Sequence, residues 1–311
     1  MRTLEKPVRL SLNEIMVVTE LPPWADPVVP YAVSLARQHK AQLHIVQALS
    51  ADVSDYEPGD VAVLPRGAFR SSWRDELQKA QARHAVIDAS QMAMKMRFQA
   101  QQHDFDLAIV SARRAGAGEI SLGKAARGVL AAAECPVVIV GPGAEDDRLS
   151  RSEPATILHA TDFSTQALSA AQHAFSWALE YGSRLNMLHV VEGQGTGSDH
   201  ARARMEEPCL RWLAQLVPEE LPVWCEVDHR VSFGAAGPAI VESARELDAD
   251  LIVLGLFGLD GTCAINPGQT AMRVIREAPC PVLVVREPVA KRVPLDLVRE
   301  RKPSAATGIA A

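Results

Sequence analysis

The chain has 311 residues, 48% of them hydrophobic and 23% charged, which suits about two globular domains of ordinary size. Its net charge of −6 argues against a protein that holds nucleic acid, because phosphate binding at that scale needs clustered Lys and Arg. The apolar runs are strand-length, well short of the roughly 20 residues of a membrane-spanning helix, so no membrane partner is expected. Five scattered cysteines and a polar start indicate no disulfide framework, no zinc site and a cytoplasmic location.

The first half of the chain contains short apolar runs that predict strands. They lie at residues 15–20, 43–46, 106–110 and 137–140, with a weaker candidate at 83–88. Several runs are continuously apolar rather than alternating, as expected for strands that are covered on both faces of a sheet. The connection from 51 to 68 is irregular.

The second half repeats this plan with clearer signals. Strands are predicted at 156–160, 184–191, 223–231, 251–254 and 282–285, and helices at 165–181, 202–216, 238–247 and 270–277. Ser164 or Thr165 suits the N-cap of the first of these helices, and Gly182 suits its C-cap. Because strands and helices alternate strictly, each half is predicted to be α/β, with a doubly wound parallel sheet of about five strands.

The two halves match segment by segment. Ile-Met-Val-Val-Thr-Glu at 15–20 parallels Ile-Leu-His-Ala-Thr-Asp at 157–162, and three further pairs of segments follow in the same order at an offset of about 145 residues. The chain is therefore predicted to be a tandem duplication. Its predicted parts are domain 1 at 10–142, a linker at 143–153, domain 2 at 154–287 and a flexible tail at 288–311.

A glycine loop in domain 2 is the strongest candidate for a ligand site. Ligands of such sheets bind beyond the carboxyl ends of the strands. Asp162 follows the first strand there, and Gly255, Gly258 and then Gly268-Gln269-Thr270 follow the fourth. Glycines allow close approach of the backbone, and the free N–H groups at a helix start favour a phosphate.

These features resemble the universal stress protein family. The resemblance rests on the Gly-x2-Gly-x9-Gly spacing, the aspartate after the first strand and the closing Ala-Pro-Cys-Pro-Val-Leu-Val-Val, and it covers nearly the whole chain twice. It implies two universal stress protein-like domains with the adenine nucleotide alpha hydrolase-like fold. In ATP-binding members the aspartate lies near the adenine, the end of the second strand offers backbone contacts, and the glycine loop wraps ribose and phosphates. The implied nucleotide site is Asp162, Val190 or Val191, Gly255, Gly258, Gly268, Gln269 and Thr270.

One departure concerns the phosphate end of that site. The family usually has Ser or Thr directly after the third glycine, whereas this chain has Gln269. The loop also contains almost no basic residue, so ATP would depend on backbone donors and on a metal such as Mg²⁺. No metal site made by the protein alone is predicted.

Domain 1 departs further from the family pattern. Ser111 and Arg114 occupy the positions of the first two glycines, Lys124 follows Gly123, and Glu20 replaces the aspartate. Side chains at the first two positions would obstruct a ligand, although the basic residues could attract an anion. The interpretation that we favour is a domain that has lost its ligand.

The resemblance predicts a nucleotide-binding stress-response or regulatory protein. No general base, arginine finger or metal–carboxylate cluster is visible, so no catalytic residue and no enzyme activity are predicted. The alternatives are a nucleotide-free scaffold for dimerisation and protein contacts and, in third place, a slow ATPase. The last strand of each half resembles the edge that pairs between subunits in the family, which predicts an intramolecular pseudo-dimer and leaves a homodimer of chains open. His44, His159 and His189 are predicted to be structural, hydrogen-bonded histidines.

Overall fold

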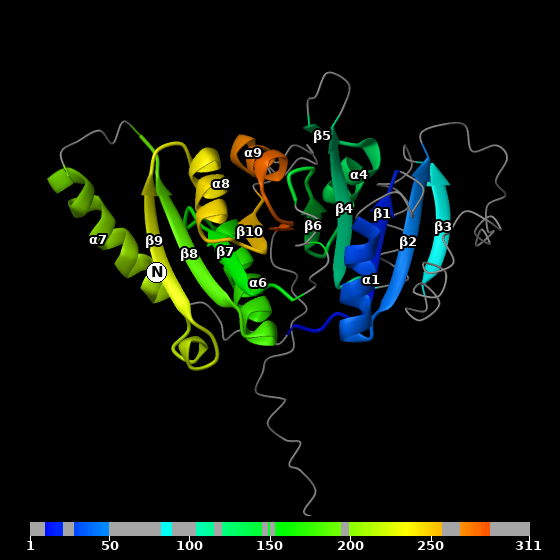
Figure 1. Ribbon diagram of the computed structural model, residues 1–311, viewed down its shortest axis with the longest axis horizontal. Helices are drawn as coiled ribbons and strands as arrows, with labels where there is room; N and C mark the ends of the chain where they lie inside the picture. Colours follow the sequence, from blue (N-terminus) through cyan, green and yellow to red (C-terminus); the bar gives the residue numbers. More distant parts are fainter. Residues whose placement is uncertain are drawn as a thin grey trace, which may run out of the picture.

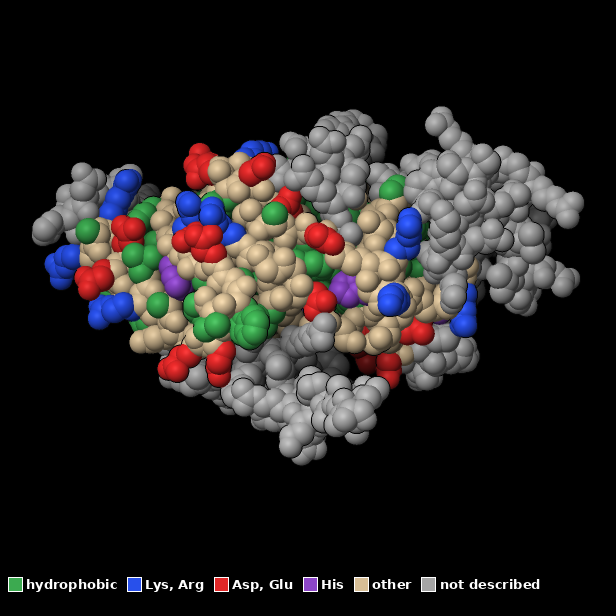
Figure 2. All heavy atoms as spheres, turned by 60° about the horizontal axis from the view of Figure 1, so that its bottom comes forward, with side chains coloured by type: hydrophobic (Ala, Val, Ile, Leu, Met, Phe, Trp, Pro, Cys, Tyr) green, Lys and Arg blue, Asp and Glu red, His purple; other side chains and the backbone are tan. Residues whose placement is uncertain are grey.

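The computed structural model describes residues 10–20, 28–49, 82–88, 104–114, 120–144, 149, 153–193, 199–256 and 268–286. The predicted loop glycine Gly258 and the predicted tail at 288–311 lie outside these ranges, as does most of the predicted linker. In the part of the chain that is described, no helix is both long and apolar enough to span a membrane. On the face shown in Figure 2, acidic and basic side chains lie interspersed, in keeping with the moderate net charge.

The described part of domain 1 is a parallel sheet with helices α1 and α4. Its elements are β1 (Glu14–Thr19), α1 (Val28–His39), β2 (Gln42–Leu49), β3 (Arg83–Asp88), β4 (Leu107–Arg114), β5 (Ile120–Leu122), α4 (Lys124–Ala132) and β6 (Val137–Val140). The main strands follow the order β3-β2-β1-β4-β6. The weak candidate strand at 83–88 is confirmed as β3, whereas β5, which pairs antiparallel with the end of β4, was not predicted.

Domain 2 follows the same plan. Its elements are β7 (Thr156–Ala160), α6 (Thr165–Tyr181), β8 (Arg184–Val191), α7 (Asp199–Leu216), the 3₁₀ helix η4 (Leu221–Val223), β9 (Val227–Phe233), α8 (Ala236–Glu246), β10 (Leu251–Gly255), α9 (Gln269–Glu277) and β11 (Val282–Val285). The strand order is β9-β8-β7-β10-β11, all parallel. Of the two N-caps predicted for helix α6, Ser164 is the one observed, since its Oγ accepts from the Ala167 N–H, and Gly182 ends the helix at φ 63° as predicted.

The predicted strand at 223–231 is wrong at its start. Residues 221–223 form η4, with Pro222 in its first turn, and the strand begins only at Val227. A proline fixes φ near the helical value and has no N–H for a strand ladder. The turn buries Leu221 fully and leaves Val223 and Trp224 largely exposed, at 76% and 70%. The apolar composition of this segment therefore does not reflect a buried strand.

The two domains join edge to edge into one sheet (Figure 1). β6 of domain 1 pairs antiparallel with β11 of domain 2, with Val138 opposite Leu283. Across the same junction Arg286 Nη1 donates to the carbonyl oxygens of Leu130 and Ala131, at 2.8 and 2.7 Å. This is the intramolecular pairing that the sequence predicted.

Both faces of the joined sheet are apolar. Ile15 and Val17 face a buried layer that includes residues of α1 and α6, whereas Met16 and Val18 face a second layer that includes residues of α4, α8 and α9. Each layer contains residues of both domains. Alternate residues of one strand thus enter opposite cores, which explains why the strands are continuously apolar.

His159 is buried near the carboxyl end of β7. Its side chain is inaccessible to solvent, and its Nδ1 lies 3.1 Å from the Val253 carbonyl oxygen. Burial lowers the pKa of His159 from 6.5 to about 4, against a smaller opposite effect of that hydrogen bond. The imidazole is therefore neutral in the folded protein near pH 7, as a structural histidine should be.

The folded state should lose stability as pH falls from 6.5 towards 4, because in this window the unfolded chain binds a proton at His159 that the folded chain does not. The contribution is on the order of 3 kcal/mol across the window, at about 1.4 kcal/mol per pKa unit. Urea unfolding of wild type and His159→Leu at pH 6.5 and 4.5 measures it. The variant should show a smaller loss between the two pH values, and equal losses would contradict the assignment to His159.

Candidate functional site

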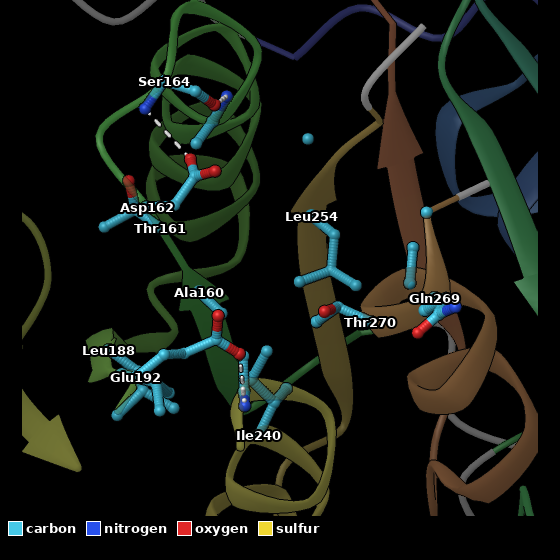
Figure 3. A pocket seen from close by; sticks show the side chains of 16 residues that line it. Ala160, Thr161, Asp162, Ser164, Leu188, Glu192, Ile240, Leu254, Gln269 and Thr270 are labelled. Atoms are coloured by element: carbon cyan, nitrogen blue, oxygen red, sulfur yellow. Dashed lines mark hydrogen bonds between the residues drawn. The ribbon is translucent and has the colours of Figure 1, made fainter. Parts of the chain in front are cut away.

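A cavity of about 260 Å³ opens in domain 2 at the carboxyl ends of the central strands (Figure 3). β7 lies between β8 and β10, so the strand order reverses here, as at the ligand site of other doubly wound sheets. The lining residues come from the ends of these strands and the starts of α6, α8 and α9. They are Ala160, Thr161, Asp162, Ser164, Ala167, Leu188, Val190, Glu192, Ala236, Ile240, Leu254, Gly255, Gly268, Gln269, Thr270 and Ala271.

The cavity brings together most of the predicted site residues. Those that line it are Asp162, Val190, Gly255, Gly268, Gln269 and Thr270. Val191 ends β8 but does not line the cavity, and Gly258 lies outside the described residues. Sequence reasoning missed Glu192, although an acidic residue directly after a central strand is a recognisable signal.

Asp162 is held in a tight turn between β7 and α6. Its Oδ1 accepts from the Ser164 N–H at 2.9 Å, and Thr161 Oγ1 accepts from the Phe163 N–H at 3.0 Å. Phe163 has a positive φ of 61°, a strained conformation for a bulky residue. Its ring lies 4.6 Å from that of His189, whose Nδ1 is 2.8 Å from the Thr161 carbonyl oxygen. These contacts fix the aspartate at the cavity and give His189 a structural role.

Three helices begin at the cavity, and they differ in how their first N–H groups are satisfied. At α6, Ser164 Oγ accepts from the Ala167 N–H at 3.2 Å. At α8, Glu192 Oε1 accepts from the Ala236 N–H at 3.0 Å. Helix α9 starts at Gly268, which has no side chain to cap it. A helix start carries a partial positive charge, so the first turn of α9 is the favoured place in this cavity for an anion.

The two described glycines of the loop have different roles. A Cβ on Gly255 would lie 2.5 Å from the carbonyl carbon of Gln166 and 2.6 Å from the nitrogen of Ala167, both backbone atoms at the start of α6. Gly255 is therefore required by the packing of α6 on β10. The sequence pattern had instead indicated that this glycine allows the close approach of a ligand to the backbone. A Cβ on Gly268 would meet no described residue within 4 Å, so within the described part of the chain this position adds space at the cavity.

Within the described ranges, no group of three or more His, Cys, Asp or Glu residues is arranged to hold a metal ion. Asp162 and Glu192, the two carboxylates at the cavity, each already accept a backbone hydrogen bond. Any Mg²⁺ would therefore be held mainly by the oxygens of a bound phosphate and by water.

The universal stress protein family model matches the chain twice, at residues 12–141 and 155–286. The chain belongs to the universal stress protein family. It is similar to a universal stress protein of Synechocystis sp., with 37% identity over 134 residues, which cover 42% of this chain and 84% of that protein. A universal stress protein of Mycolicibacterium smegmatis is 28% identical over 218 residues, 68% of each chain.

A solved structure has the same architecture over both domains. The universal stress protein from Archaeoglobus fulgidus DSM 4304 superposes with a TM-score of 0.60 at 20% identity and covers 90% of this chain and 100% of that one. At this identity the similarity supports the two-domain α/β fold. The ligand chemistry must come from the residues of this chain.

Replacement of the two glycines by alanine should separate their roles. Gly255→Ala forces a methyl group against the backbone of α6 and should lower the unfolding free energy by about 1–3 kcal/mol, as overpacking does. Gly268→Ala adds a methyl group at φ −52° where no described residue lies within 4 Å, so its effect should stay within about 0.5 kcal/mol. Chemical denaturation of both variants measures the difference. Equal destabilisation would contradict the packing role of Gly255.

Proposed function

We propose that domain 2 binds an adenine nucleotide, with ATP accompanied by Mg²⁺ as the preferred ligand, and that the protein serves in stress response or regulation without turning the nucleotide over. The observation that carries the proposal is the start of α9, for which no described side chain provides a cap, whereas at each of the other two helix starts of the cavity a side chain accepts from one N–H group. This difference marks one end of the cavity for phosphate.

The rest of the cavity suits the nucleoside part of such a ligand. Leu188, Val190, Ile240 and Leu254 provide apolar surface for a flat base. The carboxylates of Asp162 and Glu192 lie across the cavity from Gln269 and Thr270 (Figure 3). Carboxylates repel phosphate and accept hydrogen bonds from ribose hydroxyls or from an exocyclic amine, so the nucleoside lies at their end and the phosphates at α9.

The phosphate end lacks the hydroxyl that follows the third glycine in the family. Gln269 and Thr270 occupy the first two positions of α9, and both are exposed. The Gln269 amide can donate one hydrogen bond to a phosphate oxygen, next to the backbone donors of the helix start. Since neither side chain is cationic, Mg²⁺ is the natural source of the remaining positive charge on a bound triphosphate.

A nucleotide-free scaffold is the second candidate. The pairing of β6 with β11 favours it, because this pairing already joins the two domains without any ligand. Nucleotide titration separates the two functions, since a scaffold has no reason to be stabilised by ATP.

Thermal unfolding with and without ATP and Mg²⁺ tests the proposal. At one hundred times its dissociation constant a single bound ligand adds about 2.7 kcal/mol to the stability of the folded state. The wild-type protein should show this shift and Gly268→Trp should lose it, because the indole fills the space in front of α9. Gly268→Ala is the matched control and should retain most of the shift. An unchanged melting temperature for wild type would contradict binding.

The non-enzymatic part of the proposal needs its own measurement. Release of ADP by the wild-type protein should not exceed that by Gly268→Trp under the same conditions. A steady release that the variant abolishes would show that domain 2 is a slow ATPase instead.

A further inference from the structure

Glu20 lies against the start of α4 in domain 1. Its Oε1 accepts from the Ala125 N–H at 2.7 Å, in the first turn of the helix. Gly123 precedes that turn, and a Cβ built on it would overlap both carboxylate oxygens of Glu20. The carboxylate therefore rests on the backbone of the helix start, where an anion is favoured.

The equivalent positions of domain 2 are arranged differently. Ser111 of β4 lies opposite Val140 of β6, and Gly255 of β10 lies opposite Val285 of β11. Ser111 and Gly255 are therefore at equivalent positions of the two domains. Gly123 is the N-cap of α4 and Gly268 the N-cap of α9, yet no described residue lies within 4 Å of a Cβ on Gly268. The start of α4 thus has a carboxylate of the chain against it, whereas among the described residues the start of α9 has none and lines the cavity.

The acidic residues that follow β1 and β7 explain this difference. The Asp162 carboxylate accepts a hydrogen bond from the N–H of Ser164, two positions later in the chain. Two positions after Glu20 the chain has Pro22, which has no N–H in any conformation, so Glu20 cannot make the corresponding bond. Glutamate is also one methylene longer than aspartate. Both differences favour a conformation in which the Glu20 side chain extends to the first turn of α4.

The strand before α4 is longer than its counterpart in domain 2. In domain 2, β10 ends at Gly255, whereas β4 continues to Arg114 and pairs antiparallel with β5, with Ala112 opposite Leu122. The chain that approaches Gly123 is thus part of a hairpin.

We propose that Glu20 is a built-in anion, which occupies in domain 1 the place that a phosphate takes in domain 2. Domain 1 is then a self-filled site, and its helix start accepts an external anion only when Glu20 is removed. The contacts of Glu20 support this on their own, and only the comparison with a bound phosphate rests on the proposed function. As a consequence the chain binds one nucleotide rather than two.

Anion rescue tests the proposal in the full chain. In a Gly268→Trp background, which blocks domain 2, Glu20→Ala should lower the melting temperature, and inorganic phosphate should restore it with a saturable, millimolar dependence. Glu20→Gln keeps an oxygen that can accept from Ala125 and should fall between wild type and Glu20→Ala. Glu219→Ala, which removes an exposed carboxylate elsewhere, is the matched control and should show only the general salt effect of phosphate. A phosphate response equal in all four proteins would overturn the proposal.

A double-mutant cycle gives a second readout that does not depend on phosphate. Gly123→Ala should lower the melting temperature of the wild-type protein, because the new methyl group displaces the carboxylate. In the Glu20→Ala background, Gly123→Ala should lower the melting temperature by less than half as much as in the wild-type protein. Additive losses would overturn the proposal. Failure of ATP to bind domain 2 would leave both results unchanged, so the two proposals fail separately.

Discussion

The antiparallel pairing of β6 with β11 supports the arrangement of both domains. All four residues of each strand are buried, so their backbone N–H and C=O groups have no access to water. An unpaired sheet edge in such a place would leave several polar groups unsatisfied. The pairing removes one edge from each domain and lets the two apolar layers run across the junction.

Within this common frame the two domains differ at their helix starts. The same backbone plan places α4 and α9 at equivalent positions, yet the Ala125 N–H of α4 donates to Glu20, whereas no side chain in the described ranges caps α9. Small changes decide the outcome: an aspartate with a bonded turn in one copy, and a glutamate followed by a proline at the second position in the other. In domain 2 the start of α9 therefore lines a cavity, whereas in domain 1 a carboxylate of the chain itself bonds to the start of α4.

The sequence predicted the elements with strong local signals. Helix α6 has its cap at Ser164, its αL glycine at Gly182 and its predicted bounds, since capping and αL geometry depend on neighbouring residues only. The start of β9 was wrong because Pro222 and the burial of Leu221 stabilise a turn that composition alone does not reveal. β5 was missed because three residues carry too little pattern.

At the candidate site, too, some features were predicted from the sequence and others depend on the tertiary structure. The sequence by itself determined the fold class, the duplication and the family, because periodicity, repeated segments and glycine spacing are all local along the chain. It also identified six of the residues that line the cavity. Only the tertiary structure decided the roles of individual residues, both for Gly255 among these six and for Glu192 and Glu20 outside them. Gly255 packs against α6, Glu192 satisfies α8 and Glu20 fills the start of α4, because each role depends on which backbone atoms a distant segment brings within a few ångströms.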